Sequence, residues 1–360
     1  MKELEYPFDA AYIIKKRKSL KKALLADGTS RIRKKIAVFG GSTTSDIVKT
    51  LELFLLDAGI EPEFYESEYA QYFQDAMFPD ETLLSFKPDI VFIHTTNRNV
   101  TDWPEMTDTT EQIDKKLHTE INRFTAMWKS IAEKFHCPII QNNFEMPLYR
   151  LLGSRDAWDI HGRTNFLTRL NEAFYAYARE NESFYIHDLN FVSADYGLKE
   201  WSNPLFWNMY KYAMCFEAIP SFAFSVSHII KSIFGKNKKA LALDLDNTLW
   251  GGVVGDDGVD GIEIGQETGV SQSYYEFQTY VKQLKSLGIV LTVCSKNDHE
   301  NAIAGLNHPE GALRPDDFVI IKANWENKDR NIAETAAELN ILPDSCLLYT
   351  SDAADEARSV

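Results

Sequence analysis

The sequence has few cysteines, no long apolar run and a shortage of positive charge. Its four cysteines are scattered and form no Cys-x-x-Cys pair, which argues against a zinc site or a disulfide framework. No apolar run reaches the ~18–20 residues of a membrane span. Residues 1–7 lack the apolar core of a signal peptide. We therefore expect a protein of the reducing cytoplasm.

The charge balance is acidic, with 38 Lys and Arg against 53 Asp and Glu and a formal net charge of −15. Such a chain binds poorly to nucleic acid and to anionic membranes, so we expect neither as a partner. The 360 residues, 44% of them hydrophobic, have an ordinary globular composition. Their number predicts two domains.

Strands alternate with helices in the first two thirds of the chain. We expect strands at 35–39, 89–93, 138–141 and 184–187, and helices at 11–25, 46–56, 111–135 and 218–234. This alternation predicts a parallel sheet with crossover helices. The short basic segment 235–239 then predicts a linker, which separates a first domain, 1–234, from a second that starts at residue 240.

The second domain repeats the α/β pattern. We expect strands at 240–243, 289–293 and 318–321, and helices at 273–287, from 298 and at 327–339. Ligands of open α/β sheets bind beyond the carboxyl ends of the strands. Asp244 and Asp246 follow the first strand, and Leu245 points the other way, so both carboxylates can face one cavity. Taken alone, an Asp-x-Asp pair fits a solvated turn equally well.

The longer motif is more specific. The string 244–258 (DLDNTLWGGVVGDDG) resembles the first motif of haloacid dehalogenase (HAD) phosphotransferases, and more narrowly that of the FkbH-like, type IIIC branch. The strings 293–297 (VCSKN) and 324–328 (NWENK) resemble the second and third motifs of this branch, and 277–278 and 313–318 also match it. The resemblance implies a HAD-like Rossmannoid domain that handles phosphoryl groups.

The resemblance and the chemistry of phosphoryl transfer assign roles to the two carboxylates. Asp244 is the candidate nucleophile, which would form an aspartyl-phosphate or a related acyl-phosphate. Asp246 is the candidate acid/base for the leaving and the incoming oxygen. Two close carboxylates repel each other unless a cation neutralises them, and hard oxygen ligands suit Mg²⁺. We therefore expect Mg²⁺ as the cofactor, with both aspartates as metal ligands.

Four further residues are candidates at the same site. We expect Thr248 to hold the loop after the first strand, and Thr248, Ser295 and Lys328 to bind phosphate. Lys328 can also neutralise charge that develops on the acyl-phosphate. Ser295 could instead cap the helix that starts near residue 298. Cys294 is expected to be a packing residue, and the alternative is a nucleophile that carries an acyl group as a thioester.

Three functions remain open at this stage. The FkbH resemblance implies an enzyme that dephosphorylates an acyl phosphate of the glyceryl type and loads the acyl group onto the phosphopantetheine thiol of a carrier protein. A plain Mg²⁺-dependent phosphatase of a small phosphorylated metabolite is the second hypothesis. A noncatalytic module that docks a carrier protein is the third.

The first domain carries a weaker signal. Gly40-Gly41-Ser42-Thr43, after a predicted strand, resembles the nucleophile turn of SGNH-type hydrolases, and Asn97 or Asn99 could be that family's asparagine. None of the eight histidines has an aspartate three positions earlier, as a working hydrolase requires. We therefore expect an SGNH-like, flavodoxin-like sheet without catalytic activity.

The last residues depart from the HAD pattern. The family continues with a strand and paired acidic residues that complete the Mg²⁺ site, whereas this chain continues CLLYTSDAADE at 346–356. We expect the native HAD domain, 240–345, to be incomplete, and 346–360 to be a foreign tail that leaves the last strand position open. Residues 346–350 are nevertheless apolar enough for a strand. Asp352 and Asp355 could imitate the missing acids by accident.

Overall fold

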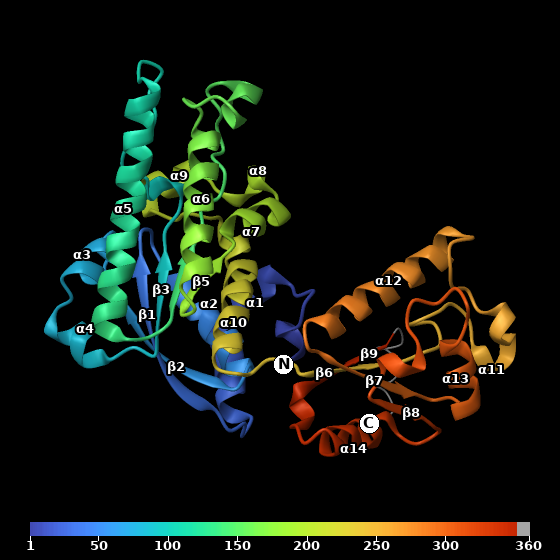
Figure 1. Ribbon diagram of the computed structural model, residues 1–360. Coiled ribbons are helices and arrows are strands. Elements are labelled where there is room, and N and C mark those ends of the chain that lie inside the picture. Colours follow the sequence, from blue (N-terminus) through green and yellow to red (C-terminus); the bar gives the residue numbers. More distant parts are fainter. Residues whose placement is uncertain (351–360) are drawn as a thin grey trace. The chain divides into compact units, whose positions relative to one another are not determined.

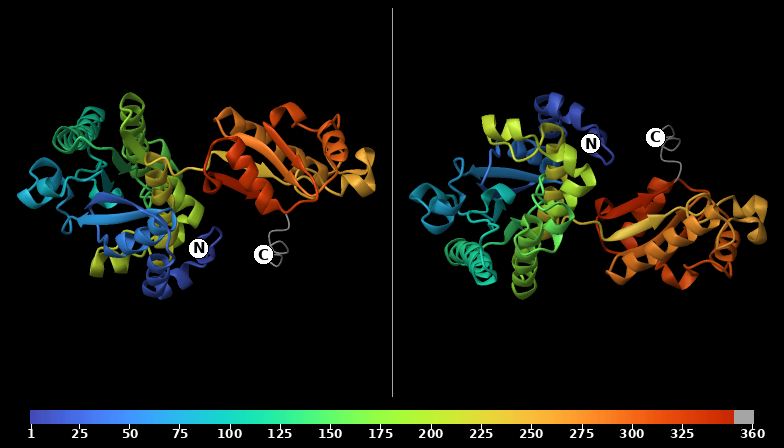
Figure 2. Two further views of the ribbon diagram at one scale, coloured as in Figure 1. Left: turned by 90° about the horizontal axis from the view of Figure 1, so that it is seen from below. Right: turned by 90° about the horizontal axis from the view of Figure 1, so that it is seen from above.

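The chain forms two compact units, Met1–Gly235 and Lys236–Val360, in a computed structural model that describes residues 1–350. The division falls at the start of the basic segment 235–239. Each unit has one parallel sheet with helices on both of its faces (Figures 1 and 2), which confirms the predicted α/β class. Within residues 1–350, no helix combines the length and apolar character needed to cross a bilayer.

The sheet of the first unit has the strand order β2-β1-β3-β4-β5, and all neighbours are parallel. Its strands are β1 (Ile32–Gly40), β2 (Ile60–Glu66), β3 (Ile90–His94), β4 (Ile139–Asn142) and β5 (Phe184–His187). This is the 2-1-3-4-5 order of flavodoxin-like sheets, as predicted. In such sheets the connections after the strands form the ligand-binding edge.

Alternate residues of β1 face opposite layers of helices, as the period of a strand requires. Ile36 and Val38 are buried against one layer, and Ala37 and Phe39 against the other. The first layer consists of α1 (Ala10–Ala26), α2 (Ser45–Asp57) and α10 (Ile219–Ile233). The second consists of α3 (Tyr72–Met77), α5 (Thr110–Phe135) and α6 (Arg163–Glu180). Shorter helices are α4 (Glu81–Phe86), α7 (Leu189–Tyr196), α8 (Leu198–Trp201) and α9 (Pro204–Tyr210).

The sheet of the second unit has the order β8-β7-β6-β9, again with parallel neighbours. Its strands are β6 (Ala240–Leu243), β7 (Val290–Ser295), β8 (Ile320–Ala323) and β9 (Cys346–Tyr349). Numbered within the unit, the order is 3-2-1-4, which is that of a Rossmann sheet. The predicted Rossmannoid fold is therefore confirmed.

Helices cover both faces of this second sheet. Residues Leu291 and Val293 of β7 pack in the core with α12 (Gly269–Ser286) and α13 (His299–Leu306). Val290, from the same strand, packs on the opposite face with α14 (Lys328–Glu338). The short helix α11 (Val254–Asp257) follows the loop after β6. Alternate side chains of β7 therefore point toward α14, and those between them point toward α12 and α13.

The strand β9 corrects one expectation. We expected the position beside β6 to be open, but Cys346–Tyr349 occupies it in register, with Ala240 opposite Cys346 and Leu243 opposite Tyr349. The expectation was wrong because this short apolar segment can pair with β6, and Cys346 is buried. The origin of residues 346–360 stays a prediction. Asp352 and Asp355 lie outside the described residues.

Candidate active site

The loop after β6 carries both predicted catalytic carboxylates. Asp244 is the first residue after the strand, and its backbone N–H donates to the carbonyl of Tyr349, the last residue of β9, at 3.1 Å. Leu245 is completely buried in the core. Because Leu245 points into the core, Asp244 and Asp246 point toward the edge of the sheet, where both are partly buried. The predicted alternation across this tripeptide is what the structure shows.

Asp244 is held by three donors from three segments. Its Oδ2 accepts hydrogen bonds from Nζ of Lys328 at 2.7 Å and from the hydroxyl of Thr350 at 3.1 Å. Its Oδ1 accepts from the backbone N–H of Leu245 at 2.8 Å. Lys328 is the first residue of α14, so the fold brings the predicted nucleophile and the predicted cation together at one edge of the sheet.

Asp246 is fixed just as firmly. Its Oδ1 accepts from the indole N–H of Trp250 at 2.9 Å and from the backbone N–H of Val254 at 3.0 Å. Its Oδ2 accepts from the side-chain amide of Asn297 at 2.9 Å. Burial raises the pKa of Asp246, and the nearby charge of Asp244 acts in the same direction, against the hydrogen bonds from Val254 and Trp250. A carboxyl with a raised pKa can more readily carry a proton to a leaving group.

Ser295 and Thr248 lie at the same edge. Ser295 ends β7, its side chain is buried, and its carbonyl accepts from the backbone N–H of Asn324 at 3.2 Å. Thr248 is buried, and its backbone N–H donates to the carbonyl of Leu245 at 3.0 Å. The N-cap of α13 is Asp298, so the alternative interpretation of Ser295 as a helix cap is wrong. Phosphate binding by Ser295 and Thr248 stays a prediction.

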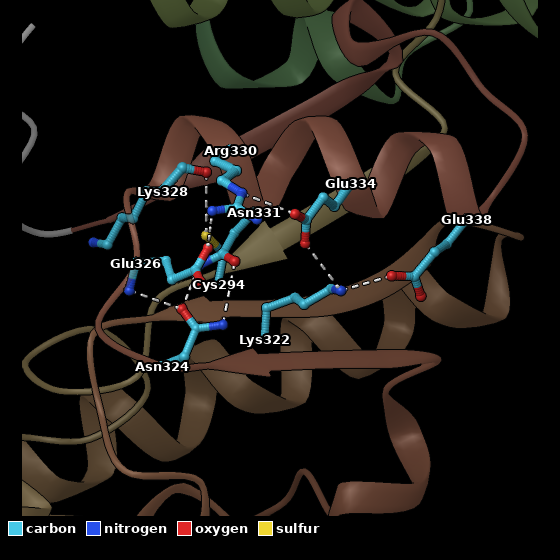
Figure 3. Close-up of polar contacts among 9 residues, drawn as sticks. All are labelled: Cys294, Lys322, Asn324, Glu326, Lys328, Arg330, Asn331, Glu334 and Glu338. Carbon is cyan, nitrogen blue, oxygen red and sulfur yellow. Dashed lines mark hydrogen bonds and ion pairs between the residues drawn. The ribbon is translucent and has the colours of Figure 1, made fainter.

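Cys294 faces away from this edge. It alternates with Val293 and Ser295 along β7 and points toward α14, where its Sγ lies 3.7 Å from the carbonyl oxygen of Lys328 (Figure 3). Its side chain is 1% exposed. A thiol so thoroughly buried cannot reach an acyl donor without local opening. The structure therefore favours packing over acyl transfer for Cys294.

A polar network fixes the start of α14, which carries Lys328. The side-chain amides of Asn324 and Asn331 donate to each other's carbonyls, at 3.3 and 2.8 Å (Figure 3). Asn331 lies one turn after Lys328, and Asn324 follows β8 directly. Lys322 of β8 adds ion pairs to Glu334 and Glu338 of the same helix. These contacts hold α14 on β8 and so position Lys328.

Gln278 of α12 links the loop after β6 to the segment before β8. Its side chain is buried, and its amide donates to the carbonyl of Leu249 at 2.8 Å. Its amide oxygen accepts from the backbone N–H groups of Ala312 and Leu313. The sequence matches at 277–278 and 313–318 are therefore parts of one packed unit around the loop after β6.

Sequence reasoning missed three residues that bind the two carboxylates. Asn297 is in the quoted string 293–297 but was given no role, although its amide bonds Asp246. Trp250 is in the first motif but was given no role, and it is also a residue of the core. Thr350 lies in the segment expected to be foreign. Only the position of Asn297, just after a strand end, offered a usable signal.

The two carboxylates suit Mg²⁺ in their chemistry. Asp244 and Asp246 present hard oxygen ligands, and the proximity of their charges contributes to the raised pKa of Asp246. Mg²⁺ is commonly held by one or two carboxylates, with water and substrate phosphate completing the shell. Among residues 1–350 there is no cluster of three or more His, Cys, Asp or Glu side chains arranged to hold a metal. Two carboxylates fit this cation, with water and substrate phosphate as the remaining ligands.

The hydrolase-like turn of the first unit lacks an accessible nucleophile. Ser42 is 2% exposed, and within the described residues its hydroxyl has no hydrogen-bond partner. Asn99 donates from its side-chain amide to the carbonyl of Gly41 at 2.9 Å, while Asn97 contacts Glu145. Of the two candidate asparagines, Asn99 thus lies beside the turn. The burial of Ser42 supports the expectation of a noncatalytic domain.

The two parallel sheets, with a carboxylate–lysine cluster at the edge of the second, define a two-domain protein of the FkbH-like HAD-IIIC type. A family model described as FkbH, N-terminal domain, matches residues 35–231. That match extends over more than half of the chain, and the chain belongs to the FkbH family.

One solved structure is similar over nearly the whole chain. It is the N-terminal part of the protein BF1531 from Bacteroides fragilis, which contains a phosphatase domain and is complexed with Mg. It is 30% identical, with a TM-score of 0.84 over 96% of this chain and 90% of that chain. A GDSL-like lipase from Bacteroides thetaiotaomicron is 12% identical over 61% of this chain and 99% of that chain, and its TM-score of 0.31 is too low to carry an argument. No curated protein matches this chain.

Proposed function

We propose that this protein is a Mg²⁺-dependent phosphatase-type enzyme that acts on a small phosphorylated metabolite through Asp244. The observation that carries the proposal is the contact between Lys328 and Asp244, at 2.7 Å, with Asp246 fixed two residues further on. The similar Bacteroides fragilis structure, with its phosphatase domain and Mg, supports it.

The proposed reaction has two steps. A carboxylate oxygen of Asp244 attacks the phosphorus in line, which forms an aspartyl-phosphate and breaks the bond to the leaving oxygen. Asp246 gives its proton to that oxygen and then takes a proton from the water that attacks the aspartyl-phosphate. The water's oxygen leaves on inorganic phosphate, and Asp244 is regenerated as a carboxylate.

The remaining groups stabilise charge. Lys328 faces the oxygen of Asp244 and can neutralise the negative charge that develops there. Asp244 and Asp246 would hold Mg²⁺, which when bound would neutralise charge on the phosphoryl oxygens. Ser295 and Thr248 lie at the same edge and would contact those oxygens.

Loading of an acyl group onto a carrier protein rests on the family resemblance alone. The buried Cys294 gives it no support, because a thioester there would need access that the structure does not provide. If loading occurs, the carrier thiol itself must attack the phosphorylated acyl group. Adding a phosphopantetheine-bearing carrier to the phosphatase assay, and weighing the carrier by mass spectrometry, separates loading from simple hydrolysis.

The proposal is tested by phosphate release from a panel of small phosphate esters and acyl phosphates. Activity should require Mg²⁺ and disappear in EDTA. Asp244→Asn keeps the shape of the side chain but removes its charge, and it should lower turnover by at least ~10³-fold. Asp260→Asn, a change at an exposed aspartate of the same region, is the control and should retain activity. If Asp244→Asn turned over substrate about as fast as the control, the assignment of Asp244 as the nucleophile would be wrong.

A further inference from the structure

A cavity of about 310 Å³ lies in the first unit, and none of the candidate catalytic residues of the second unit lines it. Asn97 and Arg98, which follow β3, and Glu145, which follows β4, form one side of it. It is therefore located beyond the carboxyl ends of neighbouring parallel strands, where open α/β sheets bind their ligands. Its volume lies within the range of small-molecule sites, roughly 300–1,000 Å³.

Two arginines of this cavity are stacked on tryptophans. The guanidinium of Arg98 lies 5.4 Å from the ring centre of Trp207, and that of Arg163 lies 4.9 Å from the ring centre of Trp103. All four residues line the cavity. Stacking on an aromatic face orients a guanidinium and leaves its N–H donors at the edge available to a ligand.

Neither arginine has its charge neutralised within residues 1–350. The ion pairs of this part of the chain include neither Arg98 nor Arg163. Arg155 provides the contrast, because it also stacks on a tryptophan, Trp158, but forms an ion pair with Asp159 at 2.6 Å and does not line the cavity. Among the described residues, the cavity therefore has two oriented cations that form no ion pair with a carboxylate.

Glu145 does not cancel this positive charge. Its side chain is 4% exposed, and its Oε2 accepts from the backbone N–H of Asn97 at 3.2 Å. Burial raises the pKa of Glu145 to about 8, although the charge of Arg98 acts against this. At neutral pH the carboxyl carries a proton, so it does not repel an anion and can donate a hydrogen bond to one.

We propose that this cavity binds a small organic anion, with a carboxylate or phosphate head held by Arg98 and Arg163 and an apolar body held against Trp103 and Trp207. Planar guanidinium groups recognise both head groups through paired hydrogen bonds. Ser42 is not among the lining residues, so binding needs no hydrolysis by the first unit.

The test measures binding to the full chain by isothermal titration and by quenching of tryptophan fluorescence. The probes are phenyl phosphate, benzoate and, as the uncharged comparison, benzyl alcohol. The Asp244→Asn variant is used throughout, so that turnover at the second unit does not consume phenyl phosphate. Binding at the first unit can then fail or succeed independently of the proposed phosphatase activity.

At least one anionic probe should bind, and benzyl alcohol should bind at least ~10-fold more weakly, because it lacks the charge that the arginines recognise. Arg98→Gln and Arg163→Gln should each weaken anion binding by ~10-fold or more, whereas the matched control Arg155→Gln should not. Tighter binding of phenyl phosphate assigns a phosphate head, and tighter binding of benzoate a carboxylate head. No binding of either anion at ~10 mM, equal binding of benzyl alcohol, or equal affinities in the three arginine variants would overturn the proposal.

Discussion

The Nζ atom of Lys328 lies 2.7 Å from Oδ2 of Asp244, although 84 positions separate the two residues in the sequence. Their side chains are 10% and 14% exposed. An ion pair so far withdrawn from water is weakly screened, and removal of Lys328 takes away the cation that faces the carboxylate of Asp244. The pair therefore couples the start of α14 to the loop after β6.

Replacing Lys328 tests the catalytic part of this coupling. Lys328→Met should lower kcat by ~10²–10³-fold, because the charge that faces the reacting carboxylate is lost. Lys328→Arg should recover part of the loss. Lys296→Met, at an exposed lysine next to Ser295, is the control and should leave kcat near that of the wild type. Equal kinetics for Lys328→Met and Lys296→Met would contradict the assignment.

The variant Cys294→Ala tests whether Cys294 is a packing residue or a nucleophile that carries an acyl group. Because the thiol faces α14 and is buried, the variant should keep phosphate release within about threefold and lose ~1 kcal/mol of stability through the smaller side chain. Carrier loading, if the protein performs it, should also persist. Phosphate release is measured with the same substrates, and stability by urea unfolding. A correctly folded variant that releases phosphate but no longer loads a carrier would restore the thioester hypothesis.

Much of the fold followed from hydrophobic periodicity, and the exceptions have physical causes. The edge strand β2 was missed because Pro62 and three glutamates interrupt its apolar pattern, and an edge position tolerates both. The helix α6 was missed because the polar residues Thr164 and Asn171 interrupt its buried apolar face. The strand β9 was assigned to a foreign tail because its residues differ from the family pattern, yet pairing with β6 needs only a short apolar segment.

The candidate site was predictable where residues follow strand ends, and less so where partners come from elsewhere. Asp244, Asp246 and Ser295 follow β6 or end β7, so the topology of a parallel sheet brings them to one edge. Lys328 was assigned through its motif, because no local rule places a helix-start lysine on a distant aspartate. The donors of Trp250 and Asn297 to Asp246 depend on loop conformation, which spacing does not specify.

A substitution at Gly305 tests whether the hydrogen bond from Trp250 holds Asp246 in place. A Cβ atom at Gly305, in α13, would lie 2.8 Å from two ring atoms of Trp250, whose indole N–H donates to Asp246. Trp250 is 1% exposed and has little room to move. Gly305→Ala should therefore cost ~1–3 kcal/mol of stability, measured by urea unfolding, and lower kcat by displacing the donor.

Gly255→Ala is the control for that change. The added Cβ would meet the side-chain amide of Asn301 at 3.5 Å, an ordinary contact, and Gly255 is exposed in the short helix α11. Its stability and kcat should remain near those of the wild type. If both alanine variants behaved alike, Trp250 would have to be mobile, and its role in holding Asp246 would be lost.

The raised pKa of Glu145 leads to a prediction of how the stability of the protein depends on pH. Burial raises its pKa in the folded protein to about 8, whereas the unfolded chain should have the ordinary value of ~4.3. Between these values the folded state binds more protons than the unfolded state, so this group's contribution makes stability fall as pH rises, by up to ~1.4 kcal/mol per pH unit.

The buried His94 and His187 affect stability in a different pH range. Burial lowers the pKa of each to about 3, so their contribution is lost as pH falls below ~6.5.

The variant Glu145→Gln isolates the contribution of Glu145 to the pH dependence of stability. Glutamine can still accept the hydrogen bond from the N–H of Asn97 but cannot ionise, so the variant should gain stability relative to the wild type as pH rises from 5 to 8. Urea unfolding at pH steps across this range measures the difference, and Glu133→Gln, at an exposed position of α5, should show no such trend. Below about pH 4 the difference in stability between the two proteins should stop changing, because the unfolded carboxyl then holds its proton as well. If the stability difference between Glu145→Gln and wild type stayed constant across the range, Glu145 would have to ionise in the folded cavity. The arginines there would then already have a carboxylate partner.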